Sequence, residues 1–192
     1  MKPEKNLKNR TRAASLLAIC ALAACILQCA GCGYTSRSVI TEKFKTIYIP
    51  AFVNKIDLTK EARSGRQYKL YRPFLESDIT RSVIDRFLAD GNLRPVSQEM
   101  SDLVLRGELA DFRRDALRYD KNDDVVEYRV SISVNIALVD RKEDKALWKE
   151  DGFTGSTTYF AEGASAVSED KAITDAFDDL ARRIVERTVE DW

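Results

Sequence analysis

The sequence of 192 residues contains no histidine, and its four cysteines all lie within the first 32 residues. Histidine is the commonest general base and metal ligand, so its absence removes the usual centre of acid–base or metal chemistry. No cysteine remains after position 32 to form a disulfide bond or a zinc site. A P-loop, a Gly-x-Ser-x-Gly motif and a dinucleotide fingerprint are also missing. We therefore expect a protein that is not an enzyme and uses no metal or cofactor.

An excess of charge of one sign is absent as well. The chain has 31 basic and 31 acidic residues, and the part that follows residue 31 has 26 basic and 30 acidic ones. This slightly acidic balance argues against a nucleic-acid partner. Asp123, Asp124 and Glu127 lie close together, but without a glycine at loop spacing they indicate a turn and not an ion site.

The one long apolar run is Ala13–Cys32, and it follows a segment with five basic residues and one acidic residue. A basic segment before an apolar run is typical of a secretory signal peptide. The run ends in the small residues Ala30 and Gly31 followed by Cys32, and a cysteine at the first mature position can be acylated. We predict that residues 1–31 are a lipoprotein signal peptide and that Cys32 carries the lipid.

Two alternatives to this signal peptide remain open. Leu22-Ala23-Ala24-Cys25 matches the usual lipobox more literally, whereas Cys29 stands where lipoproteins usually have leucine before the acylated residue. Acylation of Cys25 is therefore the alternative to Cys32. A run of about 20 apolar residues can also span a bilayer, so an uncleaved membrane anchor is the second alternative.

The remainder of the chain predicts one domain on a short tether. Residues 32–43 are mostly polar and are interpreted as the lipidated tether. Residues 44–192 are long enough to bury a core and are interpreted as a single α+β domain. No long apolar run recurs in them.

The first half of this domain predicts a strand, a helix and a return strand. Lys45–Pro50 is rich in β-branched and aromatic residues and is predicted to be a strand, and the charged segment Asn54–Arg72 to be a loop. In Pro73–Ala89 apolar residues recur every four positions, which predicts a helix that Gly91 ends. Leu93–Val96 is predicted to be a short extended segment.

The second half predicts three long strands and a helix. From Asp102 to Phe160 apolar residues alternate with polar ones, most regularly in Tyr128–Leu138, and two charged turns interrupt them. The alternation slips within Phe112–Tyr119, which indicates a bulge. Apolar residues spaced four, three and four apart predict a last helix that Ser165 or Ser168 caps and that ends near Val189.

These elements together predict a two-layer α+β sandwich. We expect a mostly antiparallel four-stranded sheet with two helices on one face, in the order β-α-β-β-β-α, plus a short extra strand. Both helices have one apolar face, so both should cover the same face of the sheet.

Several segments, in order and spacing, resemble the LPS-assembly lipoprotein family, LptE. The likeness begins at Cys32-Gly33-Tyr34 and continues in Leu88-Ala89-Asp90-Gly91 at the end of the predicted helix. It then includes Asp102–Gly107 at the start of a strand and Val126–Val130 at the start of the regularly alternating strand. The Cys-Gly-aromatic start favours Cys32 over Cys25. The residue at position 29 is the main departure from the family pattern.

The resemblance implies a function without catalysis. Such lipoproteins sit at the inner leaflet of the outer membrane, plug the LptD β-barrel, assist its folding and help lipopolysaccharide reach the outer leaflet. The family's lipid A contacts lie on basic residues at one end of the domain. The closest match here is the turn between two long strands, which contains Lys121 and has Arg118 just before it. The expected partners are therefore a barrel like LptD, lipopolysaccharide, and the outer membrane through the N-terminal lipid.

Other interpretations compete with these. Arg113, Arg114, Arg118 and Lys121 are interleaved with aspartates, which also suits a solvated turn with local ion pairs. Trp148, Tyr159 and Phe160 suit either a protein interface or a core. An activator lipoprotein of an envelope polymer synthase, or a secretion-channel component, also begins with a lipobox and a similar first strand. Such proteins usually interleave more helices with the sheet, so an uninterrupted three-strand meander argues against them. A structural envelope lipoprotein without a transport role is the third interpretation.

Overall fold

The computed structural model describes residues 39–56 and 73–190, which fall within one compact unit, Arg37–Trp192. The other unit, Met1–Ser36, contains Cys25 and Cys32 and lies outside the described residues, as does most of the predicted loop Asn54–Arg72. In the described part of the chain, no helix is both long enough and apolar enough to cross a membrane. The elements, in chain order, are α2 (Val39–Lys43), β1 (Thr46–Tyr48), β2 (Val53–Asn54), α4 (Leu75–Asp90), β3 (Arg94–Pro95), η2 (Gln98–Met100), β4 (Leu103–Tyr119), β5 (Val125–Asp140), β6 (Lys145–Phe160) and α5 (Glu169–Val189).

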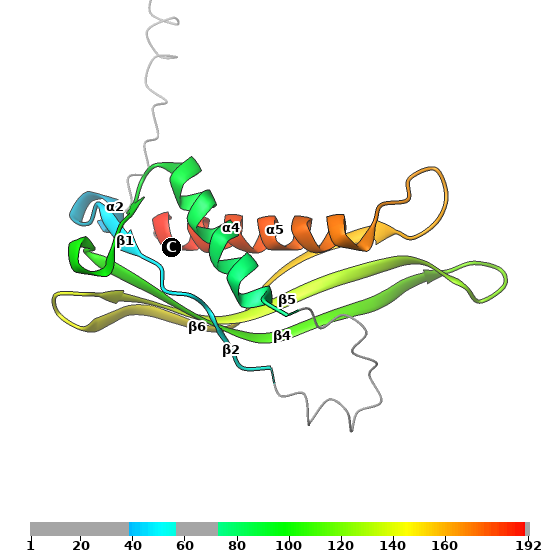
Figure 1. Ribbon diagram of the computed structural model, residues 1–192, viewed down its shortest axis with the longest axis horizontal. Helices are drawn as coiled ribbons and strands as arrows, with labels where there is room; N and C mark the ends of the chain where they lie inside the picture. Colours follow the sequence, from blue (N-terminus) through cyan, green and yellow to red (C-terminus); the bar gives the residue numbers. More distant parts are fainter. Residues whose placement is uncertain (1–38, 57–72, 191–192) are drawn as a thin grey trace, which may run out of the picture. The chain divides into compact units, whose positions relative to one another are not determined.

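Three long antiparallel strands, β4, β5 and β6, form the predicted meander (Figure 1). No helix interrupts it between Leu103 and Phe160. The pairing of β4 with β5 shifts register between Leu109 and Asp111, and again between Ala116 and Arg118. The bulge predicted within Phe112–Tyr119 is therefore present, and a second lies just before that segment.

The sheet as a whole is mixed, so the prediction of a mostly antiparallel four-stranded sheet is wrong, although the α+β class is confirmed. The strand order is β3-β1-β4-β5-β6, and β1 runs parallel to both β3 and β4. A helical crossover between β1 and β3 makes this parallel pairing possible. β2 also pairs with β4 in parallel, through Val53 and Asn54 alone. Two residues are too short to show an alternating pattern, so the sequence did not reveal β2.

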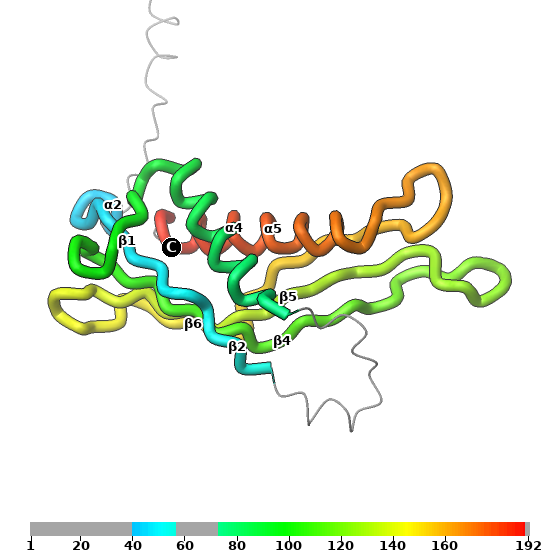
Figure 2. The backbone as a smooth tube through the Cα atoms, in the orientation of Figure 1, coloured from blue at the N-terminus to red at the C-terminus, as the bar shows by residue number. Residues whose placement is uncertain are grey.

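The two long helices, α4 and α5, lie on the same side of the long strands, as predicted (Figures 1 and 2). Gly91 ends α4 at φ 79°, and the Lys171 N–H donates to Ser168 Oγ at 3.3 Å at the start of α5. The helices and the sheet enclose one apolar core, and each large side chain in it stabilises the fold by about 1.5–3 kcal/mol. Its members include Leu75, Ile79, Val83 and Phe87 of α4, Leu105, Leu109 and Phe112 of β4, Val130, Ile132, Val134, Ile136 and Leu138 of β5, and Ile173, Phe177, Leu180 and Ile184 of α5.

Glycines allow the closest contacts between the two layers. Gly155 of β6 pairs with Ile132 in the middle of the sheet. A Cβ atom on Gly155 would lie 2.5 Å from Leu180 Cα and 2.6 Å from Leu180 N, so the backbone of α5 occupies the space of a side chain. Gly107 of β4 is packed similarly, but there the space is filled by the ring of Phe52.

Two buried or half-buried carboxylates connect α2, β1 and the β5–β6 turn. Asp102 Oδ2 accepts hydrogen bonds from the backbone N–H of Lys45 and Thr46 at 3.1 and 3.2 Å and from Thr46 Oγ1 at 2.8 Å. Burial alone would raise the pKa of Asp102, but these hydrogen bonds outweigh it and lower the pKa. Asp140 accepts from the backbone of the β5–β6 turn and pairs with Lys43 of α2 at 3.6 Å.

We predict that Gly155→Ala destabilises the domain by about 3 kcal/mol, because the new methyl group overlaps the backbone of α5. Shortening Leu180 cannot relieve this overlap, since the atoms involved are its Cα and N. Gly107→Ala is the matched control, because Phe52→Leu should rescue it by trimming a side chain. Chemical denaturation measures the unfolding free energy of Gly155→Ala alone and with Leu180→Ala, and of Gly107→Ala alone and with Phe52→Leu. Rescue of Gly155→Ala by Leu180→Ala would contradict the prediction.

A second prediction concerns the pH dependence of stability. The folded-state pKa of Asp102 is lowered, so its stabilising contribution is present above the unfolded pKa of about 3.9 and is lost as the pH falls through the folded pKa. Asp102→Asn should therefore reduce the loss of unfolding free energy between pH 6 and pH 2. Urea unfolding at several pH values measures this, with Asp85→Asn on the exposed side of α4 as control. Equal acid sensitivity in the wild type and Asp102→Asn would contradict it.

Candidate functional site

The β4–β5 hairpin extends beyond the elements that pack against its base. β6 ends at Phe160, which pairs with Glu127 of β5, and α5 begins only at Glu169. Residues 117–126 therefore form a two-stranded projection, which Figure 1 shows at the end of the long strands opposite α2. The predicted site residues Arg118 and Lys121 both belong to this projecting hairpin.

The turn at the tip of the hairpin is stabilised by one of its own carboxylates. Asp120 accepts hydrogen bonds from the backbone N–H of Asn122 at 2.8 Å and of Asp124 at 2.9 Å, and Asp123 adopts φ 64°. This confirms the turn that the sequence predicted. Lys121 is exposed and forms no ion pair with any residue in the described ranges 39–56 and 73–190. It is a cation available to an external anion.

Arg118 is exposed over 63% of its side chain and pairs with Glu127 at 3.3 Å. Its guanidinium carbon lies 5.6 Å from the centre of the Phe160 ring. An exposed ion pair of this kind contributes little to stability, so Arg118 can accept another anionic partner at small cost. The structure thus places Arg118 and Lys121 in the same hairpin end, and their contact with a glycolipid stays a prediction.

The other two basic residues of this region point to opposite faces of the sheet. Arg113 lies on the face away from the helices, 3.7 Å from both Asp111 and Asp115. Arg114 lies on the helix side, where it forms an ion pair with Glu169 of α5. The four basic residues therefore do not form one cluster, and the local ion pairs that the interleaved aspartates suggested are present.

Arg114 belongs to a half-buried cluster that the sequence analysis missed. Its guanidinium carbon lies 4.5 Å from the centre of the Tyr128 ring, and Tyr128 stacks on Tyr159 with ring centres 5.6 Å apart. The Tyr159 hydroxyl donates to Glu169 Oε2 at 3.3 Å. Burial alone would lower the pKa of Arg114, but the Tyr159 hydroxyl and the Glu169 carboxylate raise it. We call Arg114, Tyr128, Tyr159 and Glu169 the hairpin-base cluster.

A similar arrangement lies near the other end of α5. Arg187 pairs with Glu150 of β6, and its guanidinium carbon lies 4.9 Å from the centre of the Trp148 ring. Trp148 is half-buried next to the core, and its buried Nε1 has no hydrogen-bond partner among the described residues. Of the three aromatic residues singled out in the sequence, Tyr159 is buried, while Trp148 and Phe160 each pack against an arginine.

The face of the meander opposite the helices is polar. Side chains on a strand alternate between faces, so the residues between the buried positions of β5 point away from the helices. Among these are Ser133 and Asn135, and Ser133 shares a hydrogen bond of 2.8 Å with Thr154 of β6. Charged residues border this face and line a shallow hollow of about 230 Å³, among them Arg106, Glu108, Lys149 and Asp151.

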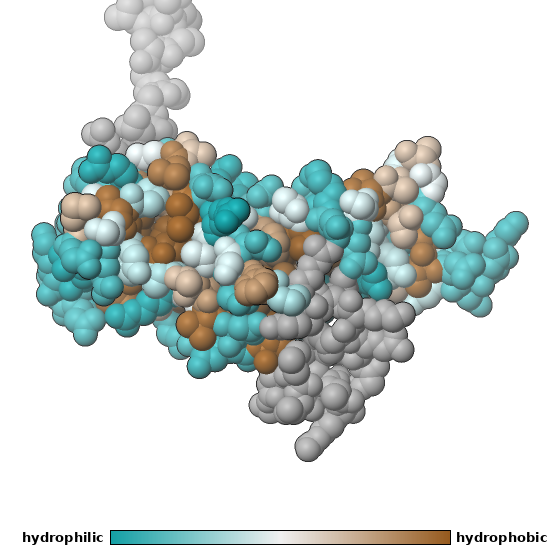
Figure 3. All heavy atoms as spheres, in the orientation of Figure 1, coloured by the Kyte–Doolittle hydropathy of each residue, from teal (hydrophilic) through white to brown (hydrophobic). Residues whose placement is uncertain are grey.

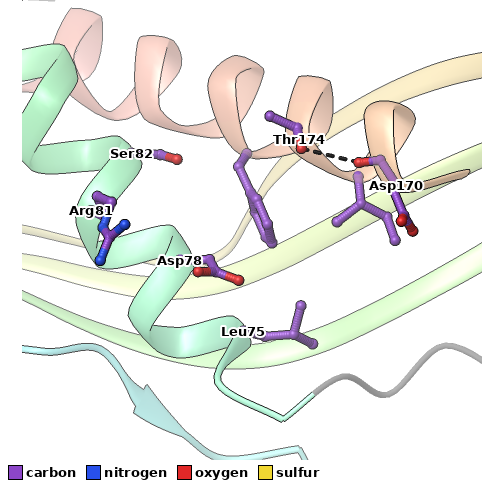
Figure 4. Close-up of a pocket in the computed structure, with 8 residues that line it drawn as sticks. Leu75, Asp78, Arg81, Ser82, Asp170 and Thr174 are labelled. Carbon is purple, nitrogen blue, oxygen red and sulfur yellow. Dashed lines mark hydrogen bonds between the residues drawn. The ribbon is translucent and has the colours of Figure 1, made fainter. Parts of the chain in front are cut away.

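An open hollow of about 250 Å³ also lies between α4 and α5 (Figure 4). Its floor is apolar, with Leu75, Ile173 and Phe177, and Asp78 and Arg81 stand at its rim. The described residues contain no group of histidine, cysteine, aspartate and glutamate side chains that could hold a metal ion. The hairpin end therefore remains the candidate site. In Figure 3 its projecting tip is hydrophilic, with hydrophobic residues behind it.

Comparison with known proteins finds a family model over most of the domain. The model described as "LptE: Lipopolysaccharide-assembly" matches residues 44–188. No protein in a search of curated proteins matches the sequence.

The solved structures most similar to the chain include three proteins of low sequence identity. A minor lipoprotein from Acinetobacter baumannii is 18% identical with a TM-score of 0.49, and the alignment covers 76% of this chain and 94% of that one. A PelC dodecamer from Paraburkholderia phytofirmans is 14% identical with a TM-score of 0.43, covering 78% and 91%. The rare lipoprotein B from Shewanella oneidensis is 14% identical with a TM-score of 0.38, covering 73% and 89%.

Proposed function

The chain belongs to the LptE lipopolysaccharide-assembly family, and we propose that it is a lipid-anchored protein that docks on a β-barrel translocon. In this role it helps lipopolysaccharide reach the outer leaflet and assists assembly of the barrel. The observation that carries the proposal is the family match, because it spans nearly all described elements from β1 to α5. The family role is lipopolysaccharide assembly at the outer membrane and involves no catalysis.

The placement of α2 and the hairpin supports an orientation for the domain. The chain leaves Cys32 and enters the domain at α2, which Lys43 connects to Asp140 beside the β5–β6 turn. The β4–β5 hairpin lies at the opposite end of β4, whose 17 residues at about 3.3 Å each span about 55 Å. A lipid on Cys32 would therefore hold the α2 end near the anchored leaflet and direct the hairpin away from it.

The polar face of the meander is the surface we assign to the barrel. The interior of a transmembrane β-barrel is polar, so a protein that enters it needs a polar and charge-balanced surface. The face that carries Ser133 and Asn135 meets this requirement, and neither α4 nor α5 covers it. Charges of both signs lie on this face, since Arg113 forms ion pairs with Asp111 and Asp115.

The hairpin is the part we assign to lipopolysaccharide. Its lipid A portion carries phosphates, and a guanidinium group can bind a phosphate through two hydrogen bonds. Arg118 and Lys121 supply the cations, while Leu117 and Tyr119 are apolar side chains of the same hairpin that are 39% and 57% exposed. Cations next to exposed apolar groups suit an amphiphile with a phosphorylated head.

The first prediction from this proposal concerns the anchor. Cys32→Ala should abolish labelling of the protein by radioactive palmitate and leave the signal peptide uncleaved, whereas Cys25→Ala should change neither. Gel mobility and mass spectrometry of the mature N-terminus measure cleavage. Loss of labelling in Cys25→Ala but not in Cys32→Ala would move the acylation site to Cys25. Absence of any lipid or cleavage in the wild type would overturn the lipoprotein assignment.

The second prediction concerns the hairpin. Arg118→Glu combined with Lys121→Glu should weaken binding of lipopolysaccharide by about tenfold or more, because two attractive charges become repulsive. The matched control is Arg86→Glu with Arg94→Glu, which reverses two exposed cations away from the hairpin. Binding is measured with the full lipoprotein in detergent. Equal affinity in the wild type and the hairpin variant would refute the assignment of the hairpin to lipopolysaccharide.

The same preparations test the partner. Affinity purification from detergent-solubilised envelopes should capture a large outer-membrane β-barrel with the wild type and with both charge-reversal variants. Capture of a polymer synthase or of a secretion-channel component in its place would favour the alternative function, although the uninterrupted meander from Leu103 to Phe160 argues against it.

A further inference from the structure

The direction in which the hairpin projects requires a physical cause. A two-stranded hairpin alone is marginally stable in water. Residues 117–126 pair with no third strand and with no helix, and one backbone hydrogen bond, from the Ala161 N–H to the Val126 carbonyl group, reaches them from outside the hairpin. Bulges at the base, between Ala116 and Tyr119, also interrupt regular pairing there. Regular sheet geometry therefore does not fix the direction, and contacts of the side chains at the base must contribute.

The hairpin-base cluster supplies such contacts from four elements. Arg114 of β4 bonds to Glu169 in the first turn of α5, 55 residues away in sequence. Tyr128 of β5 lies under Arg114 and stacks on Tyr159 of β6, whose hydroxyl reaches the same carboxylate. Tyr128 pairs with Ala116, the last residue of β4 before the bulge. The cluster thus connects both strands of the hairpin to the start of α5.

We propose that Arg114, held by Glu169 and by the stacked rings of Tyr128 and Tyr159, is a positioning residue. It fixes the direction of the β4–β5 hairpin, so that Arg118 and Lys121 meet the phosphates of the glycolipid together. This inference rests on the proposed function of the hairpin. It adds a residue that does not itself touch the lipid.

The chemistry of the cluster requires an arginine. A guanidinium group is planar, so it can lie flat over the Tyr128 ring while its edge donates to Glu169, whereas the ammonium group of lysine is a compact charge that cannot do both. Arg114 and Glu169 are 26% and 31% exposed, so solvent screens their interaction less than that of Arg118 with Glu127. Arg114→Lys therefore keeps the positive charge but cannot contact the Tyr128 ring and Glu169 at the same time.

The other end of α5 provides a matched control. Arg187 has the same kinds of partner, a carboxylate and an aromatic ring, and its exposure of 29% is close to that of Arg114. It packs β6 against the C-terminal half of α5, whereas the hairpin projects beyond the N-terminal end of α5. Arg187→Lys therefore removes a comparable arginine contact between α5 and β6 and leaves the contacts of the hairpin unchanged.

The experiment compares lipopolysaccharide binding by the full lipoprotein in detergent. We expect Arg114→Lys to weaken binding by about fivefold and Arg187→Lys to leave it unchanged, at similar losses of thermal stability. If Arg114→Lys does not accumulate, Tyr159→Phe removes only the hydroxyl bond to Glu169 and should weaken binding to a smaller extent. Equal binding by the wild type and the Arg114 variant, or equal losses in both lysine variants, would overturn the proposal.

A double-mutant cycle tests whether Arg114 acts through the hairpin cations. In the background of Arg118→Glu with Lys121→Glu, Arg114→Lys should cause no further loss of binding, because the contacts that it positions are already gone. Independent, additive losses would contradict positioning. If the hairpin variant alone binds normally, the proposed function of the hairpin fails. If it binds weakly while Arg114→Lys binds normally, only the present inference fails.

A distance measurement gives a readout that needs no ligand. Spin labels on Asn122→Cys at the tip and Asp178→Cys on the exposed side of α5 report the direction of the hairpin, and the labelled parent without these cysteines gives the background. Arg114→Lys should broaden the distance distribution relative to that of the doubly labelled protein with Arg114 intact, and Arg187→Lys should leave it as narrow as in that protein. A narrow distribution in Arg114→Lys would show that the cluster does not set the direction of the hairpin.

Discussion

The domain depends on the absence of a side chain at Gly155, where the backbone of α5 comes into contact with β6. Because α5 lies this close to β6, its residues Asp179 and Arg183 reach the outer edge of β6. Asp179 accepts the N–H of Ser156 at 3.0 Å, and Arg183 donates to the Thr154 carbonyl group. The unpaired edge of a strand is a site of unwanted association, so here the helix both closes the core and occupies part of that edge.

Arginine side chains pack on aromatic rings at several places along the sheet. Four guanidinium groups lie over aromatic rings of β5 or β6: Arg114 over Tyr128, Arg118 over Phe160, Arg183 over Phe153 and Arg187 over Trp148. Three of them also connect α5 to the sheet, through Glu169, the Thr154 carbonyl group and Glu150. Arg118 differs because its carboxylate partner, Glu127, lies in β5 at the base of the hairpin and not in α5. Its interaction therefore holds no helix in place, which leaves it suited to an external ligand.

The sequence predicted the features that repeat over many residues and missed those that depend on a single contact. The meander, both long helices, the Gly91 stop and the Ser168 cap follow from local periodicity and capping chemistry. The parallel pairing of β1 and the two-residue strand β2 do not, because no local pattern records which strands become neighbours. The ion pair of Arg114 with Glu169 joins residues 55 positions apart. The sequence showed only an arginine at the point where the alternation slips. The bulge between Leu109 and Asp111 turns Arg114 toward α5.

The two ends of β4 are held in place by different kinds of contact. Near Leu103, hydrogen bonds of Asp102 and the bonds of Asp140 brace β1, α2 and the β5–β6 turn against one another. Near Tyr119, support comes from side chains at the base of a hairpin that otherwise stands alone. Arg118 and Lys121 lie outside the apolar core, so substitutions at these two positions should leave the core intact.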